Sequence, residues 1–225
     1  MSIQQRAYSQ DQKLQRRDDI LNAAATLFEQ RRYEQITMDD IAKIAGVSKG
    51  TLYVYFRTKE SIFLEQARQK IDLFFGHLLE DLQSHQSPIG VDGIVSALAI
   101  AYKNSEGMTK LLSVLHQVLE YKAGFDCALT FRQALLPMLR RAGEECERHL
   151  WFITKGNGQR LLLTIHSMSL GMQQLADPSP DMKRVEEQPG MELYRFDFGP
   201  SFLAMLDCLL IGMETRAREA RTEST

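Results

Sequence analysis

The sequence predicts an all-α protein, in which an N-terminal three-helix domain with a helix-turn-helix is joined to a larger C-terminal helical bundle. Apolar residues recur at helical spacing through most of the 225 residues. Residues 37–60 (TMDDIAKIAGVSKGTLYVYFRTKE) have the pattern of two short helices joined by a tight turn. Prolines and glycines between 177 and 200 separate a last helix from the others. Together these observations set the expected order of domains and helices.

We expect three parts along the chain. Residues 1–13, rich in Gln and Ser, are expected to be a flexible N-terminal arm. We expect a helix-turn-helix domain over residues 14–62 and a larger C-terminal domain over residues 63–225.

Apolar spacing and end signals define the expected helices outside the helix-turn-helix. They cover about 14–31, 59–83, 91–103, 107–122, 126–149, 157–176 and 201–218. Pro137 should kink or split the helix that contains it, because proline removes a backbone donor. The stretch 177–200 is expected to be a break that carries a short extended segment.

Local signals place the two short helices. Thr37 and Asp40 form a capping pattern ahead of the first helix, which should begin at about Met38. Gly46 follows the periodic residues, where a left-handed backbone conformation ends a helix at little cost. Ser48 is then the N-cap of the second helix.

The second short helix has a face that suits DNA. Leu52 and Phe56 are four residues apart and should face inward. The residues left outward are Lys49, Gly50, Thr51, Tyr53 and Tyr55. Small residues at the start of a helix allow close approach, while hydroxyls, a lysine and backbone N–H groups suit phosphate oxygens. The pattern therefore predicts a helix that enters the major groove.

The motif GVSKGTLYVYF, followed by a lysine–glutamate pair, resembles the DNA-binding domain of the TetR family of bacterial transcriptional regulators. The resemblance covers about residues 14–63. It implies an all-helical homodimer whose larger C-terminal domain usually binds a small effector. It also implies that operator contacts fall on Thr37, Ser48, Lys49, Thr51, Tyr53, Tyr55 and Lys59, with Gly50 close to the bases.

Two positions depart from the family pattern. Val54 stands between the two tyrosines where members often carry histidine, so one phosphate contact is lost. Arg32 stands before Tyr33 where a glycine is common. Because arginine disfavours the left-handed conformation, this turn is expected to be wound differently.

Charge and cysteine content agree with a DNA-binding protein of the cytoplasm. The net charge is −2, but residues 1–60 hold ten Lys or Arg against eight Asp or Glu. The three cysteines are scattered without a Cys-x-x-Cys pair, which indicates a reducing compartment and no zinc site. The N-terminus is polar, and no apolar run approaches the ~20 residues of a membrane span, so we expect no membrane association.

No catalytic constellation is present in the sequence. It has no Gly-x-Ser-x-Gly, no phosphate-binding glycine loop and no metal-ligand pair on one helix face, and its five histidines are scattered. We therefore expect no enzyme, no cofactor and no metal. A helical enzyme is the remaining alternative class, which turnover without any need for DNA would reveal.

The sequence thus predicts a ligand-responsive repressor that binds a palindromic double-stranded operator and is released by a small hydrophobic effector. Large or polar-tipped residues on several helices are expected to line the effector pocket. These are Phe74, Tyr102, Met108, His116, Tyr121, Phe125, Phe131, Met138 and Met168. An alternative stays open, in which the C-terminal domain only dimerises and its core is filled.

Two apolar seams near the C-terminus are expected to form the homodimer interface. The first consists of Leu161, Ile165, Met168, Met172 and Leu175. The second consists of Phe202, Leu203, Leu206, Leu209, Leu210 and Met213. Paired with their copies across a two-fold axis, these helices would make a four-helix interface.

Overall fold

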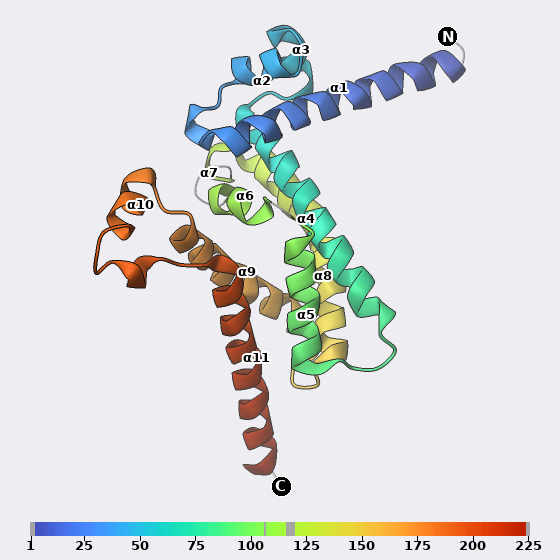
Figure 1. Ribbon diagram of the computed structural model, residues 1–225. Helices are drawn as coiled ribbons and strands as arrows, with labels where there is room; N and C mark the ends of the chain where they lie inside the picture. Colours follow the sequence, from blue (N-terminus) through green and yellow to red (C-terminus); the bar gives the residue numbers. More distant parts are fainter. Residues whose placement is uncertain (1–2, 106, 116–119, 224–225) are drawn as a thin grey trace. The chain divides into compact units, whose positions relative to one another are not determined.

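The computed structural model describes residues 3–105, 107–115 and 120–223, and within these ranges every regular element is a helix (Figure 1). This confirms the predicted all-α fold. The chain divides into two compact units. The first is Met1–Gln69 with Val114–Arg132, and the second is Lys70–Ser113 with Gln133–Thr225.

The first unit carries the helix-turn-helix. Its elements are α1 (Ile3–Gln30), the 3-10 turn η1 (Tyr33–Gln35), α2 (Met38–Ile44), α3 (Lys49–Tyr55), the start of α4 (Lys59–Ser84), α7 (Glu120–Lys122) and the start of α8 (Phe125–His149). The second unit holds the rest of α4 and α8, with α5 (Gly90–Lys103), α6 (Met108–Val114), α9 (Gly158–Ala176), α10 (Pro180–Glu186), η3 (Glu192–Tyr194) and α11 (Phe198–Glu223).

Aromatic rings at the centre of the first unit fix the base on which α2 and α3 rest. The fully buried Phe63 of α4 meets Phe28 of α1 and Tyr33 of η1 edge-on, at ring-centroid distances of 5.4 and 5.2 Å. Ile20 and Leu27 bury the rest of this α1 face, as its spacing predicts. Edge-on aromatic pairs stabilise a fold beyond the burial of their apolar surface, so α1, η1 and α4 are held together as the base for α2 and α3.

The expectation of a flexible N-terminal arm at residues 1–13 differs from the structure, because α1 begins at Ile3 and includes residues 3–13. Residues 3–13 (IQQRAYSQDQK) contain no Pro or Gly and are rich in residues of good helix propensity. A helix that already buries Ile20 and Leu27 can therefore continue toward the N-terminus. The expected domain boundary at 62 also differs from the observed units, since the first unit reaches Gln69 and includes 114–132.

Three further helix predictions differ from the structure. Of the kink or split expected at Pro137, the split does not occur, because α8 runs from Phe125 to His149 through it. The helix expected at 107–122 is represented by α6 and α7, and its residues 116–119 lie outside the described residues. The stretch 177–200 forms α10 and η3 in place of an extended segment. Ser179 caps α10 and Pro180 opens it, a helix-start signal that the prolines obscured.

An aromatic cluster fills part of the second unit. Tyr102 of α5 meets Phe74 of α4 and Phe202 of α11, each at 4.8 Å between ring centroids, and Phe198 stacks on Phe202. Burial raises the pKa of Tyr102 to about 12, partly offset by a hydrogen bond with Ser169 of α9. The cluster therefore ties α4, α5, α9 and α11 together.

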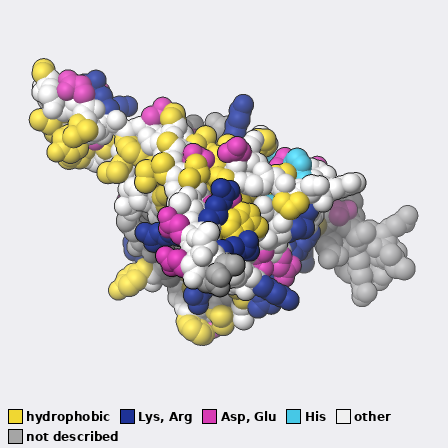
Figure 2. Space-filling view, turned by 90° about the horizontal axis from the view of Figure 1, so that it is seen from below, with side chains coloured by type: hydrophobic (Ala, Val, Ile, Leu, Met, Phe, Trp, Pro, Cys, Tyr) yellow, Lys and Arg dark blue, Asp and Glu magenta, His cyan; other side chains and the backbone are white. Residues whose placement is uncertain are grey.

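Apolar surface remains exposed in the second unit. Hydrophobic side chains gather on the part formed by α10 and η3, which exposes Met182, Val185, Leu193 and Tyr194 (Figure 2). By length and composition alone, α11 is the one helix among the described residues that is long and apolar enough to cross a membrane, and a single such helix is weak evidence of a membrane span. Its most apolar 18-residue window has a mean hydropathy of 1.2, and only 17% of that window is buried. Most of this apolar window is thus not covered by its own chain.

Candidate nucleic-acid interface

The start of α2 is fixed by the expected capping box. The backbone N–H of Asp40 donates to the Thr37 hydroxyl, and the Asp40 carboxylate accepts from the Thr37 hydroxyl at 2.6 Å and from its N–H at 3.0 Å. These bonds lower the pKa of Asp40. The Thr37 side chain is exposed, but its proton is already engaged within the cap.

The turn into α3 also follows the sequence signals. Gly46 has a φ of +64°, the left-handed conformation expected at the end of α2. Ser48 caps α3 by accepting from the Thr51 N–H at 3.1 Å, and the two hydroxyl oxygens lie 2.8 Å apart. Leu52 and Phe56 are buried, which sets the opposite face of α3 outward.

Glycine at position 50 has no explanation inside the chain. It adopts no positive φ, and an added Cβ would meet only the Ser48 hydroxyl oxygen, at 3.9 Å. Glycine weakens a helix, so some other requirement must favour it. Close approach of an outside partner to the first turn of α3 meets that requirement.

Charged and aromatic side chains lie beside Gly50 on the outward face. Lys49 is exposed, and its ammonium group is 2.8 Å from the carboxylate of Asp39 in the first turn of α2. A hydrogen bond with Asp39 and the charge of that carboxylate raise the pKa of Lys49. Tyr53 is exposed one turn later, and Tyr55 is half-buried. Asp39 is not among the residues predicted from the sequence to contact DNA, because its pairing with Lys49 depends on how α2 packs on α3.

Lys59 has a structural function that the resemblance did not indicate. Its half-buried ammonium donates to the carbonyls of Tyr33 at 2.7 Å and Ile36 at 2.8 Å, and lies 4.0 Å from the centre of the Tyr33 ring. Burial lowers the pKa of Lys59. The neighbouring Glu60 accepts from the Tyr33 hydroxyl, whose pKa is raised by burial and by Glu60. We therefore correct the assignment of Lys59 as a phosphate contact: it fastens η1 to α4.

The two departures from the family pattern have clear structural outcomes. Arg32 adopts an extended conformation (φ −71°, ψ 150°), so the turn before Tyr33 needs no left-handed residue. Val54 is strongly exposed on α3, where a histidine would offer a donor. The outward face thus presents one cation, hydroxyls and two tyrosines around a glycine, a combination suited to phosphates and to close approach in a groove.

Comparison with known proteins identifies the family. A model described as "Bacterial regulatory proteins, tetR family" matches residues 20–65. A second model, "Tetracyclin repressor-like, C-terminal domain", matches residues 69–217, about two thirds of the chain. This chain belongs to the TetR family. It is therefore a TetR-family transcriptional regulator with a DNA-binding helix-turn-helix.

Curated relatives match about a third of the chain. The chain is 38% identical over 78 residues to the HTH-type transcriptional repressor KstR2 of Mycolicibacterium smegmatis, covering 35% of this chain and 38% of the relative. It is 30% identical over 82 residues to the biofilm operon regulator IcaR of Staphylococcus epidermidis, covering 36% and 43%. The matches therefore span well under two thirds of these relatives.

Solved structures share the fold over most of their length. FadR of Bacillus halodurans aligns with a TM-score of 0.59 at 18% identity, covering 88% of this chain and 95% of that one. FadR of Bacillus subtilis, solved with stearoyl-CoA, aligns with a TM-score of 0.53 at 18% identity, covering 84% and 96%. At this identity the likeness shows the TetR fold alone.

The residues expected to line one effector pocket divide between the two units. Phe74, Tyr102, Met108, Met138 and Met168 belong to the second unit, and all are buried or half-buried. His116 lies outside the described residues. Tyr121 and Phe125 are 89% and 79% exposed, so their assignment as pocket residues is corrected. Both residues flank the break between two expected helices, where Gly124 has a φ of +79° and helical periodicity no longer sets the direction of a side chain.

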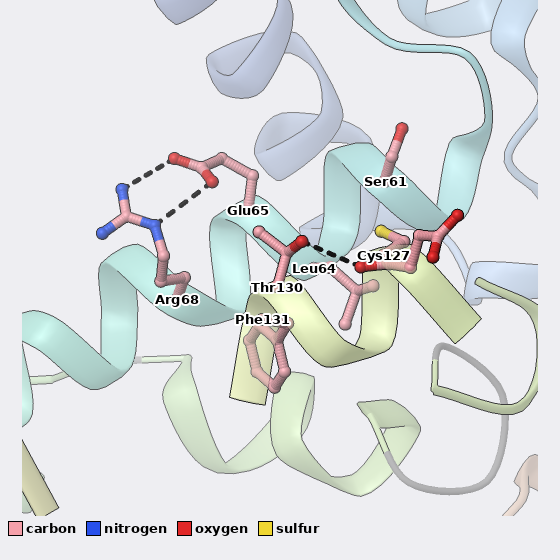
Figure 3. Close-up of a pocket in the computed structure, with 8 residues that line it drawn as sticks. Ser61, Leu64, Glu65, Arg68, Cys127, Thr130 and Phe131 are labelled. Carbon is pink, nitrogen blue, oxygen red and sulfur yellow. Dashed lines mark hydrogen bonds and ion pairs between the residues drawn. The ribbon is translucent and has the colours of Figure 1, made fainter. Parts of the chain in front are cut away.

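A pocket of about 400 Å³ lies within the first unit, between the first turns of α4 and α8 (Figure 3). Of the expected residues it includes only Phe131. Its other lining residues are Ser61, Leu64, Glu65, Arg68, Asp126, Cys127 and Thr130. Burial alone would raise the pKa of Glu65, but bonds with Arg68 and the charge of Arg17 hold it below its usual value. Burial raises the pKa of the Cys127 thiol, which disfavours the reactive thiolate.

The expected dimer seams are in part core of a single chain. Leu161, Ile165, Phe202, Leu206 and Leu210 are buried within the subunit, where α9 and α11 pack together and α11 also packs on α5. These five are corrected to core residues. Met168, Met172, Leu203, Leu209 and Met213 are half-buried, and Leu175 is exposed. Periodicity identified apolar faces correctly but did not show which neighbour covers each face.

Proposed function

We propose that this chain is a dimeric repressor that binds a palindromic operator through α3 and is released by a small hydrophobic effector. The observation that supports it most is the outward face of α3. On this face Gly50 leaves space for a close approach, and Lys49 and Tyr53 are exposed. The buried Leu52 holds the opposite face of the helix against its own chain. A single short helix reads few base pairs, so useful specificity requires two half-sites. We place this function in the cytoplasm, in agreement with the three free cysteines.

The proposed dimer uses the exposed faces of α9 and α11. On α11, the uncharged exposed residues Ala204, Met205, Cys208, Ile211, Gly212 and Thr215 follow one stripe at helical spacing. On α9, the matching stripe is Leu163, Thr164, Ser167, Gly171 and Leu175. Small residues in both stripes permit close helix approach. Because α9 and α11 pack on each other, one second copy would cover both stripes and the exposed apolar surface of α11.

The proposed effector response is a population shift. A ligand can favour release only by binding the released form of the dimer more tightly than the DNA-bound form. The match of residues 69–217 to a family-specific C-terminal domain supports such a response. The alternative, a C-terminal domain that only dimerises, remains the competing function.

Selection of bound sequences from a random DNA pool tests the proposed function. We expect an enriched inverted repeat whose half-sites are centred about 10 base pairs apart, or a multiple of one helical turn. The selected operator is then titrated in the presence of a panel of hydrophobic and amphipathic compounds. An enriched site without two-fold symmetry would contradict the dimeric mode, and binding indifferent to every compound would favour the alternative.

A further inference from the structure

Asp39 and Lys49 form an ion pair across the helix-turn-helix. Asp39 lies in the first turn of α2 and Lys49 opens α3, and their charged groups are 2.8 Å apart. Both side chains are more than half exposed. The phenol of Tyr53 is close enough to Lys49 to influence its charge. The pair therefore lies among the residues that we propose to face DNA.

This ion pair has little to do for the fold. Exposed pairs contribute little to stability, because water and salt screen them and two side chains must be ordered. The packing of α2 on α3 is secured separately by the buried Ile41, Ala42 and Leu52. Asp39 also benefits from the dipole of α2, but any acidic or polar residue in that turn would do so. The carboxylate thus has a position that folding alone does not require.

Next to DNA, the same carboxylate opposes binding. A phosphate that takes up Lys49 must displace Asp39, and the released carboxylate then lies beside a polyanion. We propose that Asp39 restrains Lys49 and so limits the affinity of this regulator for DNA. Lys49 is the side chain through which Asp39 acts, which makes Asp39 a positioning residue. This inference rests on the proposed function, because it assumes that α3 faces DNA.

The restraint has a consequence for release from the operator. Breaking one exposed ion pair costs about 1 kcal/mol in water, which lowers the affinity for DNA roughly fivefold. A dimer breaks two such pairs, so the affinity falls by roughly 25-fold. Coupling between an effector and a second site is typically only 5- to 150-fold. A dimer without the restraint would therefore hold its operator against any effector whose coupling is weaker than roughly 25-fold.

Double-mutant titration measures the restraint directly. Asp39→Asn keeps the side-chain shape and should tighten binding to the selected operator and to a mixed-sequence 40-base-pair duplex, by roughly 25-fold at low salt. The gain should shrink at 1 M salt, where the screening length is about 3 Å. In the Lys49→Gln background, the gain in DNA affinity from Asp39→Asn should be several-fold smaller, because the lysine that Asp39 restrains is absent. Thermal unfolding should show all variants folded.

Each other outcome has a definite meaning. An equal gain in both backgrounds would show that Asp39 repels DNA directly, and would overturn the restraint. An equal gain in DNA affinity from Asp18→Asn, a matched charge change on α1, would also overturn the restraint. If Lys49→Gln weakens binding while Asp39→Asn does not strengthen it, the restraint fails and the proposed function stands. If neither changes affinity, α3 does not face DNA and both proposals fail.

Discussion

Gly50→Leu should abolish operator binding while leaving the protein at least as stable as the wild type. An added Cβ at Gly50 would meet only the Ser48 hydroxyl oxygen, at 3.9 Å, so a side chain there has room to project outward from the first turn of α3. Leucine also raises helix propensity, by up to about 0.8 kcal/mol. In the groove the same side chain would hold the helix away from base edges in both half-sites. We expect operator affinity to fall by roughly a hundredfold or more.

Gly76→Leu is the matched control for this substitution. Gly76 lies in α4 and is exposed, and an added Cβ there would meet no atom within 4 Å. It should share any gain in stability and leave operator affinity unchanged. Affinity by electrophoretic shift and stability by thermal unfolding separate the two effects. Operator binding of Gly50→Leu within a fewfold of wild type would remove the first turn of α3 from the interface.

Met205→Glu combined with Ile211→Glu should convert the dimer to folded monomers and abolish high-affinity operator binding. The two residues lie on the exposed stripe of α11, 52% and 47% exposed within one chain. Glutamates there remain hydrated in the monomer, so the subunit should fold. Across a two-fold interface the carboxylates would be desolvated close to their copies, which disfavours association. Sedimentation velocity measures the state of association.

A control of equal exposure tests whether the stripe itself matters. Leu136→Glu with Val185→Glu changes two apolar residues that are 45% and 46% exposed on α8 and α10, away from both stripes. This variant should stay dimeric and bind operator. A dimeric Met205→Glu/Ile211→Glu variant that still binds operator would contradict the interface on α11. By contrast, Leu206→Glu tests only folding, because Leu206 is fully buried in its own subunit.

The sequence predicted the helix-turn-helix well because its signals act over a few residues. The Thr37 cap, the left-handed Gly46 and the Ser48 cap each depend on backbone groups three or four positions away. Such interactions form in almost any tertiary setting. The four-residue spacing of Leu52 and Phe56 within this helix also predicted correctly that both side chains face inward.

Features that depend on distant residues could not be predicted in this way. Lys59 binds carbonyls 23 and 26 residues earlier in the chain, and the Asp39–Lys49 pair requires the packing of α2 on α3. Periodicity showed that α11 is apolar, but not that Leu206 faces its own subunit and Ile211 faces outward. Tyr121 and Phe125 lie beside the break at Gly124, where periodicity does not determine whether a side chain faces inward, and both are exposed.

The salt dependence of operator binding by two lysine variants tests most directly whether the outward face of α3 contacts DNA. Lys49→Gln should flatten the slope of log affinity against log salt by roughly 0.9 for each recognition helix, because a phosphate contact is lost. Lys59→Gln removes the donor to two backbone carbonyls, so it should cost about 2 kcal/mol of unfolding free energy and leave the slope unchanged. An unchanged slope for Lys49→Gln, or an equal flattening for Lys59→Gln, would contradict this assignment of the DNA-facing surface.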